Sequence, residues 1–206
     1  MKKCNLNEVK IFGIGLSRTG TTSLTTLLQQ GFGLNIHHWP DPHRFCMERF
    51  STDPKYLNNG YNNSIIDGIT DIQAAIAYKQ LYKIYPYAKF ILTTREENLW
   101  LNSIEPHWLQ VAGINGQKLH PNVKNIVTMM WGTTNYSKEN VLNVYRNHLR
   151  EVNDFFSMMN TIGKYKNNFL TLDITSDSKS ICKLEKFLNC KSSLQDIPHK
   201  NKGSHN

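Results

Sequence analysis

The stretch from Gly15 to Thr22, GLSRTGTT, combines the residue types that hold an anion: two glycines, an arginine and several hydroxyl side chains. Before it, Val9 to Ile14 mix β-branched, aromatic and glycine residues, as a buried strand does. After it, Leu24, Leu27 and Leu28 recur at helical spacing. A loop between a strand and a helix directs its backbone N–H groups and the positive end of the helix dipole at one point. These residues therefore predict a binding site for a phosphate-like anion.

The two glycines have the spacing of a nucleotide-binding P-loop, G-x-x-x-x-G, but the residues that follow are Thr21 and Thr22 rather than Lys and Ser or Thr. The lysine that would reach the β- and γ-phosphates of a nucleoside triphosphate is therefore absent. Arg18 supplies a positive charge from inside the loop instead. This difference argues against an ordinary ATPase or kinase.

A second candidate anion site follows the segment Ala88–Thr93, AKFILT, which has the composition of a buried parallel strand. Arg95 comes shortly after that segment, and Ser103 follows eight residues later on a predicted helix. An arginine presents a fork of N–H donors to a phosphate, and a serine adds a hydroxyl group. The pair therefore predicts a second phosphate contact.

Predicted strands alternate with predicted helices, the pattern of an α/β fold with a doubly wound parallel sheet flanked by helices. The strands are expected at 9–14, 34–39, 88–93 and 168–174, and the helices at about 21–30, 72–84, 97–104, 123–131, 138–159 and after a cap at Ser176 or Asp177. Ligands of such sheets bind at the carboxyl ends of the strands. Because Arg18 and Arg95 both follow strands, we expect one anion site to contain both.

The sequence GLSRTGTTSL resembles the 5'-phosphosulfate loop of P-loop sulfotransferases, in the G-x-x-R-T-G-T-x-S-L version found in sulfotransferase-like proteins of bacteria, fungi and other groups. Arg95 and Ser103 resemble the 3'-phosphate motif of these enzymes. The segments 145–148 and 198–203 are similar to further elements of this subgroup, so the resemblance covers most of the chain. It implies a P-loop NTPase-like sulfotransferase fold and transfer of a sulfuryl group from 3'-phosphoadenosine 5'-phosphosulfate (PAPS), with 3',5'-ADP as the product.

The resemblance also implies which residues bind the donor. They lie in the loop, at the end of the later strand and in the C-terminal tail: Ser17, Arg18, Thr19, Gly20, Thr21, Thr22, Ser23, Arg95, Ser103, Lys200 and Lys202. Arg18 is expected to be catalytic as well, because a fixed cation stabilises charge that develops in the transition state. Cytosolic sulfotransferases have an Arg-Lys-Gly segment near the C-terminus, whereas this chain has no arginine there, so a frayed basic tail is an equal alternative.

A hydroxyl acceptor needs a general base. Asp71, just before the predicted helix 72–84, is the first candidate, and His38, after the second predicted strand, is the second; both match residues of the subgroup. Asp67 and His107 are weaker candidates. Structural alternatives stay open, since Asp71 has the position of a helix N-cap and His38 that of a hydrogen-bonded core or rim residue.

The length of 206 residues fits one α/β domain, and we expect a single domain over residues 1–206. The formal net charge of +8 indicates an acidic partner, and the scattered lysines favour a polyanionic small ligand over nucleic acid. No membrane span or signal region is evident, and the four cysteines show neither zinc nor C-x-x-C spacing. We therefore expect a cytoplasmic protein with reduced thiols.

Two other functions stay open: a P-loop small-molecule kinase, and a non-catalytic module that binds a nucleotide or nucleic acid. The missing P-loop lysine disfavours the first, and the scattered charges without a stacking motif disfavour nucleic acid. The acceptor is not indicated, so a small molecule and a carbohydrate are both candidates, with residues 40–66 and 106–136 expected to form its pocket. No metal is expected, and no oligomeric state is predicted.

Overall fold

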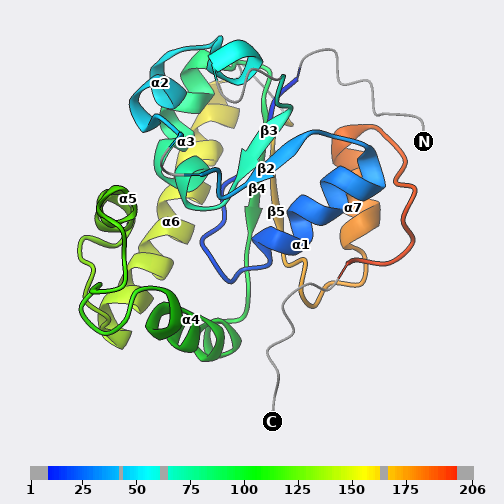
Figure 1. Cartoon of the computed structure of the whole chain (residues 1–206). Helices are drawn as coiled ribbons and strands as arrows, with labels where there is room; N and C mark the ends of the chain where they lie inside the picture. Colours follow the sequence, from blue (N-terminus) through cyan, green and yellow to red (C-terminus); the bar gives the residue numbers. More distant parts are fainter. Residues whose placement is uncertain (1–8, 42–43, 61–64, 163–166, 199–206) are drawn as a thin grey trace.

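The computed structural model describes residues 9–41, 44–60, 65–162 and 167–198. Its centre is a five-stranded sheet in which every pairing is parallel (Figure 1). In sheet order the strands are β2 (Ile36–His38), β3 (Gly68–Thr70), β1 (Ile11–Gly13), β4 (Lys89–Thr93) and β5 (Phe169–Leu172). Strand β1 is central and pairs with both β3 and β4, so the segments that leave β1 and β4 start at the same edge of the sheet.

Helices connect the strands and cover both faces of the sheet (Figure 1). They are α1 (Thr21–Thr26), which continues into the π-helical turn η1 (Leu27–Gly31), α2 (Met47–Thr52), the π-helical turn η2 (Tyr56–Gly60), α3 (Ile72–Ile84), α4 (Glu97–Val111), α5 (Pro121–Trp131), α6 (Lys138–Ile162) and α7 (Ser180–Leu188). The predicted doubly wound α/β fold is confirmed. A single domain over residues 1–206 stays a prediction.

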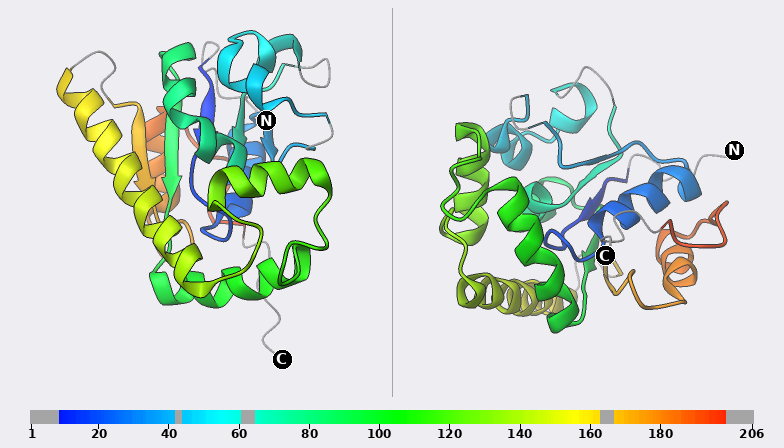
Figure 2. Two further views of the ribbon diagram at one scale, coloured as in Figure 1. Left: turned by 90° about the vertical axis from the view of Figure 1, so that its left-hand side faces the viewer. Right: turned by 60° about the horizontal axis from the view of Figure 1, so that its bottom comes forward.

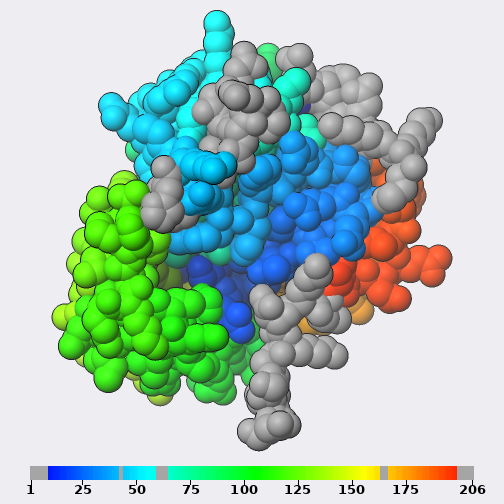
Figure 3. Space-filling model, viewed as in Figure 1, coloured from blue at the N-terminus to red at the C-terminus, as the bar shows by residue number. Residues whose placement is uncertain are grey.

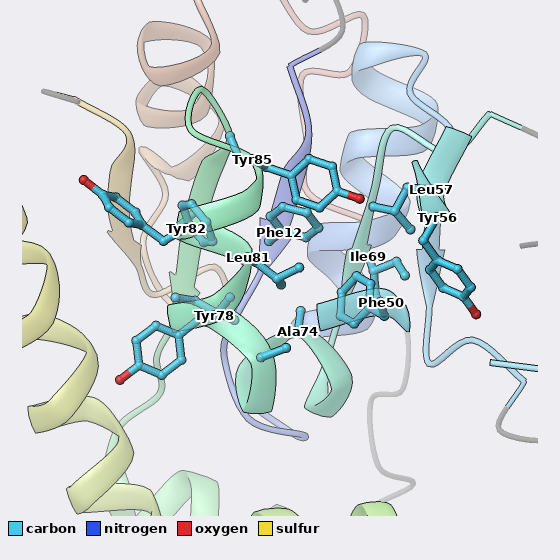
Figure 4. Close-up of a cluster of buried hydrophobic side chains, with 14 of the residues drawn as sticks. Phe12, Phe50, Tyr56, Leu57, Ile69, Ala74, Tyr78, Leu81, Tyr82 and Tyr85 are labelled. Atoms are coloured by element: carbon cyan, nitrogen blue, oxygen red, sulfur yellow. The ribbon is translucent and has the colours of Figure 1, made fainter. Parts of the chain in front are cut away.

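Alternate residues of the strands point to opposite faces of the sheet, which separates two cores. Phe12 and Phe90 pack in the cluster that contains α3 and α6 residues, whereas Ile11 and Ile91 pack in the cluster that contains α1 and α7 residues. All four side chains are fully buried. Figure 4 shows the first cluster, in which the rings of Phe50 from α2 and of Tyr85, just after α3, lie against Phe12. These apolar strands were recognisable in the sequence because both of their faces are covered.

A third cluster joins α4, α5 and α6 beside the carboxyl ends of the strands (Figure 2). The Trp100 ring stacks on Tyr145 with a centroid separation of 4.2 Å, and Trp131 packs edge-on against Trp108 at 5.5 Å. Trp100 and Trp131 are almost completely buried. The helical lobe therefore has a core of its own, and that core holds α4 next to the loop that follows β1.

The structure differs from the predicted elements in three places. The short strand β3 was not predicted, because it has only three residues and the first is a glycine. At Gly68 a Cβ atom would lie 1.8 Å from the Ile11 carbonyl oxygen, so this position cannot hold the apolar side chain that would indicate a buried strand. Helix α4 does not end at 104 but continues through Pro106, because Trp108 beyond the proline is buried in the lobe. Helix α7 begins at Ser180, and neither Ser176 nor Asp177 caps it.

Cysteine Cys190 is disulfide-bonded, whereas Cys46 and Cys182 are free thiols. The prediction of reduced thiols is therefore wrong for Cys190. A cytoplasmic location stays a prediction. Among the described residues, no helix has the length and apolar character needed to cross a membrane.

Truncation of Phe156 tests how the α6 side of the sheet is held. This fully buried ring stacks on Phe169 at 4.3 Å and contacts Phe90 at 5.1 Å. We expect Phe156→Ala to lower the free energy of unfolding by about 3–5 kcal/mol, measured by chemical denaturation. The matched control is Met158→Ala on the same helix, which is half exposed and should change stability by less than about 0.5 kcal/mol. Equal losses in the two variants would contradict this packing.

Candidate active site

The loop between β1 and α1 closes tightly on the end of β4. A Cβ atom at Gly15 would lie 1.9 Å from Thr93 Oγ1, and one at Gly20 would lie 2.4 Å from Ile174 Cγ2. Gly20 also has φ of 96°, in the region that favours glycine. Thr19 is fully buried, where its hydroxyl donates to the Leu16 carbonyl at 2.6 Å and contacts Thr93 Oγ1 at 2.6 Å. Both glycines are thus required by close contacts, and the Thr19 side chain holds the loop together from inside.

Arg18, Arg95 and Ser103 lie together, as the two separate motifs predicted. Arg18 Nε donates to Ser103 Oγ at 2.8 Å, and Arg95 donates through NH1 to the Arg18 carbonyl at 3.3 Å. Burial, and then the neighbouring charge of Arg95, lower the pKa of Arg18, while Asp71 acts in the opposite direction. Ser103 therefore contacts Arg18, although the sequence had paired it with Arg95 around one phosphate. The loop reaches the surface beside the α4–α5 lobe (Figure 3).

Neither arginine is neutralised by a carboxylate in the described part of the chain. The ion pairs found there do not include Arg18 or Arg95. Arg95 Nε is buried, and it has no hydrogen-bond partner among the described residues. An unpaired buried donor is costly, so the Arg95 Nε–H group favours a bound acceptor, and the two neighbouring positive charges favour one that is anionic. This arrangement fits a ligand with more than one anionic group.

An aromatic brace holds both anion-binding segments from behind. The Tyr145 hydroxyl donates to the Arg95 carbonyl at 2.6 Å and lies 3.1 Å from the Arg95 backbone nitrogen, and Trp100 Nε1 donates to the Ser17 carbonyl at 3.0 Å. One turn along α6, His148 Nε2 lies 2.7 Å from the Ile14 carbonyl, and burial lowers the pKa of His148. The motif at 145–148 therefore supports the backbone of both loops. Sequence reasoning noticed that motif but found neither this role nor Trp100.

The two leading base candidates also lie at this loop. Ser17 Oγ donates to Asp71 Oδ1 at 2.8 Å, and Thr21 Oγ1 lies 3.5 Å from Oδ2. His38 Nε2 is 3.5 Å from Asp71 Oδ2 and 3.1 Å from Thr22 Oγ1, while its Nδ1 contacts Thr70 Oγ1 at 3.0 Å. Asp71 is the N-cap residue of α3, and its carbonyl accepts from the Ala74 and Ala75 backbone, but its side chain makes no capping hydrogen bond. The carboxylate is instead directed at the loop.

Asp71 has φ of 84° and ψ of −162°, a conformation that almost only glycine adopts. Its side chain is 8% exposed. Such backbone strain persists only where the surroundings impose it, and it is concentrated at functional sites. The strain supports the prediction of Asp71 as a functional residue independently of the sequence resemblance, and no sequence signal revealed the strain itself.

The remaining predicted residues lie in different places. Asp67 directly precedes β3, at the opposite end of that strand from Asp71, and accepts a hydrogen bond from the Asn35 backbone. His107 lies on α4, where burial and the charge of Arg18 lower its pKa, with Asp71 acting in the opposite direction. Ser23 is buried on α1. Lys200 and Lys202 lie outside the described residues.

A cavity of about 550 Å³ opens beside the loop. Ser17, His38, Asp71 and His107 line it, together with apolar side chains from α4, α5 and the segment between them. The predicted acceptor segment 106–136 therefore does form a pocket next to the anion-binding loop. From the predicted segment 40–66, no residue lines this cavity in the part that the structure describes.

A sequence profile described as a sulfotransferase domain matches residues 10–206. The chain belongs to the sulfotransferase family. Over 110 residues it is 29% identical to the "Ava biosynthesis cluster protein M" of Aspergillus versicolor, an alignment that covers 47% of this chain and 42% of that protein. The crystal structure of a sulfotransferase from Alicyclobacillus acidocaldarius superposes with a TM-score of 0.54 at 12% identity, covering 95% of this chain and 87% of that one.

These comparisons confirm the sulfotransferase resemblance and the predicted fold. Family membership shows that residues 10–206 form a sulfotransferase domain. The chain spans less than half of the curated relative that it matches, and the structural match shows the fold alone. The roles of individual residues in donor binding and catalysis stay predictions.

Two variants of Asp71 isolate the backbone strain. Asp71→Gly and Asp71→Ala both remove the contacts of the carboxylate, but only glycine adopts the local backbone angles freely. We expect Asp71→Gly to be more stable to chemical denaturation than Asp71→Ala by about 1–3 kcal/mol. An alanine variant as stable as the glycine variant would show that the segment relaxes and stores no strain.

Proposed function

We propose that this chain transfers the sulfuryl group of PAPS to a hydroxyl or amine of a small acceptor and releases 3',5'-ADP. The observation that carries the proposal is the adjacency of Arg18 and Arg95, which come from separate loops and have no carboxylate partner among the described residues. PAPS carries a phosphosulfate at one end and a 3'-phosphate on the same ribose unit. Two cations at one sheet edge suit these two anionic groups.

The loop residues are placed to stabilise the charge that develops during transfer. The acceptor oxygen forms a bond to sulfur while the bond between sulfur and the bridging phosphate oxygen breaks, and its electron pair stays on that phosphate as 3',5'-ADP leaves. The Arg18 guanidinium and the backbone N–H groups at the start of α1 favour this charge without moving. The proposal assigns charge stabilisation to these groups and requires no metal ion.

Asp71 is the proposed acceptor of the proton. It lines the same cavity as Ser17, and its carboxylate accepts a hydrogen bond from the Ser17 hydroxyl. The carboxylate therefore lies at the boundary between the loop and the proposed acceptor cavity. His38 is the second candidate, because it also lines the cavity and lies beside Asp71. A base at this boundary would meet the hydroxyl of an acceptor that approaches the loop from the cavity.

Nucleotide-dependent stabilisation tests the donor assignment. We expect 3',5'-ADP to raise the melting temperature in the absence of metal, with about 2.7 kcal/mol of stabilisation at a hundred times its dissociation constant. ADP should stabilise far less, because it lacks the 3'-phosphate that Arg95 is expected to bind. Equal shifts with ADP and 3',5'-ADP would contradict the assignment of Arg95 to the 3'-phosphate. A shift only with ATP and Mg²⁺ would favour the kinase alternative.

Steady-state kinetics with varied PAPS should separate the two arginines. Arg18→Ala is expected to lower kcat by roughly 10²–10³-fold, because Arg18 lies at the loop where charge develops. Arg95→Ala should mainly raise the KM for PAPS, because its phosphate does not react and is bound equally in the ground and transition states. Both side chains are half-buried at the rim of the site, so neither change should unfold the chain.

The matched control is Arg150→Ala, an exposed arginine on α6 that contacts Asn147. It should leave both kinetic constants unchanged. Loss of turnover in Arg95→Ala with an unchanged KM would contradict this division of roles. Full activity in both Arg18→Ala and Arg95→Ala would contradict the assignment of both arginines to the anion site.

A further inference from the structure

Two buried threonine hydroxyls, those of Thr70 and Thr25, connect His38 to the first turn of α1. His38 and Thr70 are register partners at the ends of β2 and β3, and His38 Nδ1 lies 3.0 Å from Thr70 Oγ1. Thr70 Oγ1 lies 2.6 Å from Thr25 Oγ1, and the Thr25 hydroxyl donates to the Thr21 carbonyl at 2.9 Å. Because both threonines are buried, each places its one hydroxyl hydrogen within this line of contacts.

The hydrogens fit all of these contacts in one direction only. A carbonyl oxygen can only accept, so the Thr25 hydrogen goes to the Thr21 carbonyl. The Thr70 hydrogen then goes to Thr25, and Thr70 Oγ1 accepts from His38 Nδ1. In the opposite direction Thr25 would donate to Thr70, and its bond to the Thr21 carbonyl would be lost. The complete line of bonds therefore forms only when His38 Nδ1 carries a hydrogen.

The other ring nitrogen of His38 faces the β1–α1 loop and Asp71. Nε2 lies 3.1 Å from Thr22 Oγ1 and 3.5 Å from Asp71 Oδ2. A neutral histidine has a hydrogen on one ring nitrogen and a lone pair on the other, and the partner of one nitrogen decides the state of both. With the hydrogen on Nδ1, the lone pair lies on Nε2. A proton added there would lie beside the Asp71 carboxylate, and the threonine hydroxyls would not have to reorient.

We propose that Thr70 and Thr25 are positioning residues that fix His38 in the Nδ1–H form, so that Nε2 and Asp71 accept the proton as a pair. The proposal rests on the proposed sulfotransferase function. The acceptor oxygen bonds to sulfur while the bond from sulfur to the bridging phosphate oxygen breaks, and the electron pair of that bond leaves with 3',5'-ADP. The proton of the acceptor passes to the pair and is held between Asp71 Oδ2 and His38 Nε2.

Thr22 connects this pair to the donor site. In the proposed arrangement its hydroxyl hydrogen goes to His38 Nε2. Thr22 is also one of the loop residues expected to bind the anionic donor, and a hydroxyl has only one hydrogen to give. An anion that takes this hydrogen therefore frees the Nε2 lone pair, so that donor binding prepares the proton acceptor.

NMR of the full chain, labelled with nitrogen-15 in its histidines, tests the assignment directly. Correlations between ring hydrogens and ring nitrogens distinguish the nitrogen with a hydrogen from the nitrogen with a lone pair, and the His38 signals are those absent from His38→Gln. At alkaline pH, where imidazole is neutral, we expect the Nδ1–H form to exceed the Nε2–H form by about tenfold or more. A predominant Nε2–H form in the wild-type chain would overturn the proposal.

Two neighbouring threonines of α1 give a matched comparison. The hydroxyls of Thr25 and Thr26 both donate to the carbonyl four residues earlier at 2.9 Å, but Thr25 alone of the two contacts Thr70. Thr25→Val leaves the Thr70 hydrogen free to turn to His38 Nδ1, so the Nε2–H form should predominate. Thr26→Val should keep the Nδ1–H form. Equal spectra for the two variants would overturn the proposal, since Thr25 acts on His38 only through Thr70.

Conservative variants of Thr70 test the same bond from the other side. Thr70→Val removes the acceptor of the Nδ1 hydrogen, whereas Nε2–H could still donate to Asp71, so the Nε2–H form should predominate. Thr70→Ser keeps the hydroxyl and should restore the Nδ1–H form. A melting curve for each variant separates a change of this bond from unfolding. A folded Thr70→Val variant that keeps the Nδ1–H form would contradict the role of Thr70.

Addition of 3',5'-ADP distinguishes this inference from the proposed function. We expect the nucleotide to move the Nε2 signal toward that of a lone pair without a hydrogen bond, as the Thr22 hydrogen turns to the phosphate. If the nucleotide raises the melting temperature while His38 has the Nε2–H form, the positioning role is wrong and the donor assignment survives. If the nucleotide does not bind, the sulfotransferase function is wrong, and the proton-accepting role of the pair fails with it.

Discussion

Two positively charged guanidinium groups, those of Arg18 and Arg95, are held next to each other at the carboxyl ends of β1 and β4. Burial, and then the repulsion between these like charges, lower the pKa of Arg18. The surrounding fold has to impose this arrangement, because within the described residues no carboxylate forms an ion pair with either group. An anion bound between the two groups would attract both and offset their repulsion. The arrangement at this edge of the sheet therefore suits a ligand with two anionic groups.

The fold imposes this proximity through contacts that leave little freedom. Gly15 allows the loop to touch the end of β4, so that β1 and β4 deliver their arginines to the same place. Behind them, Trp100 and Tyr145 stack on each other while each bonds to the backbone of a different anion-binding segment. In front of them, Asp71, whose backbone is strained, accepts a hydrogen bond from the Ser17 hydroxyl. The α4–α5 lobe thus holds the proposed donor site through Trp100, and neighbouring side chains of the same lobe, such as Ile104 and Trp108, line the cavity.

Local patterns explain which parts were predictable from the sequence. The loop of residues 15–22 could be predicted because its glycines, arginine and hydroxyl residues are close together in the sequence. Strand β4 could be predicted because Phe90 and Ile91, which point to opposite faces of the sheet, are both apolar. Contacts between distant segments left no such pattern. The bond between Arg18 and Ser103, the brace from Tyr145 to Arg95 and the backbone angles of Asp71 depend on tertiary packing. The continuation of α4 beyond Pro106 likewise depends on tertiary packing, because Trp108 is buried in the lobe.

The central claim is that one site formed by the β1–α1 loop and the end of β4 binds both phosphates of the donor product. A crystal structure of the chain with 3',5'-ADP, grown without metal, tests it most directly. The account predicts the 5'-phosphate on the loop from Arg18 to Thr22, and the 3'-phosphate within hydrogen-bond distance of Arg95, with Arg95 Nε or its terminal nitrogens as donors. Density for the nucleotide away from the loop, or a 3'-phosphate that faces solvent with Arg95 unchanged, would contradict it.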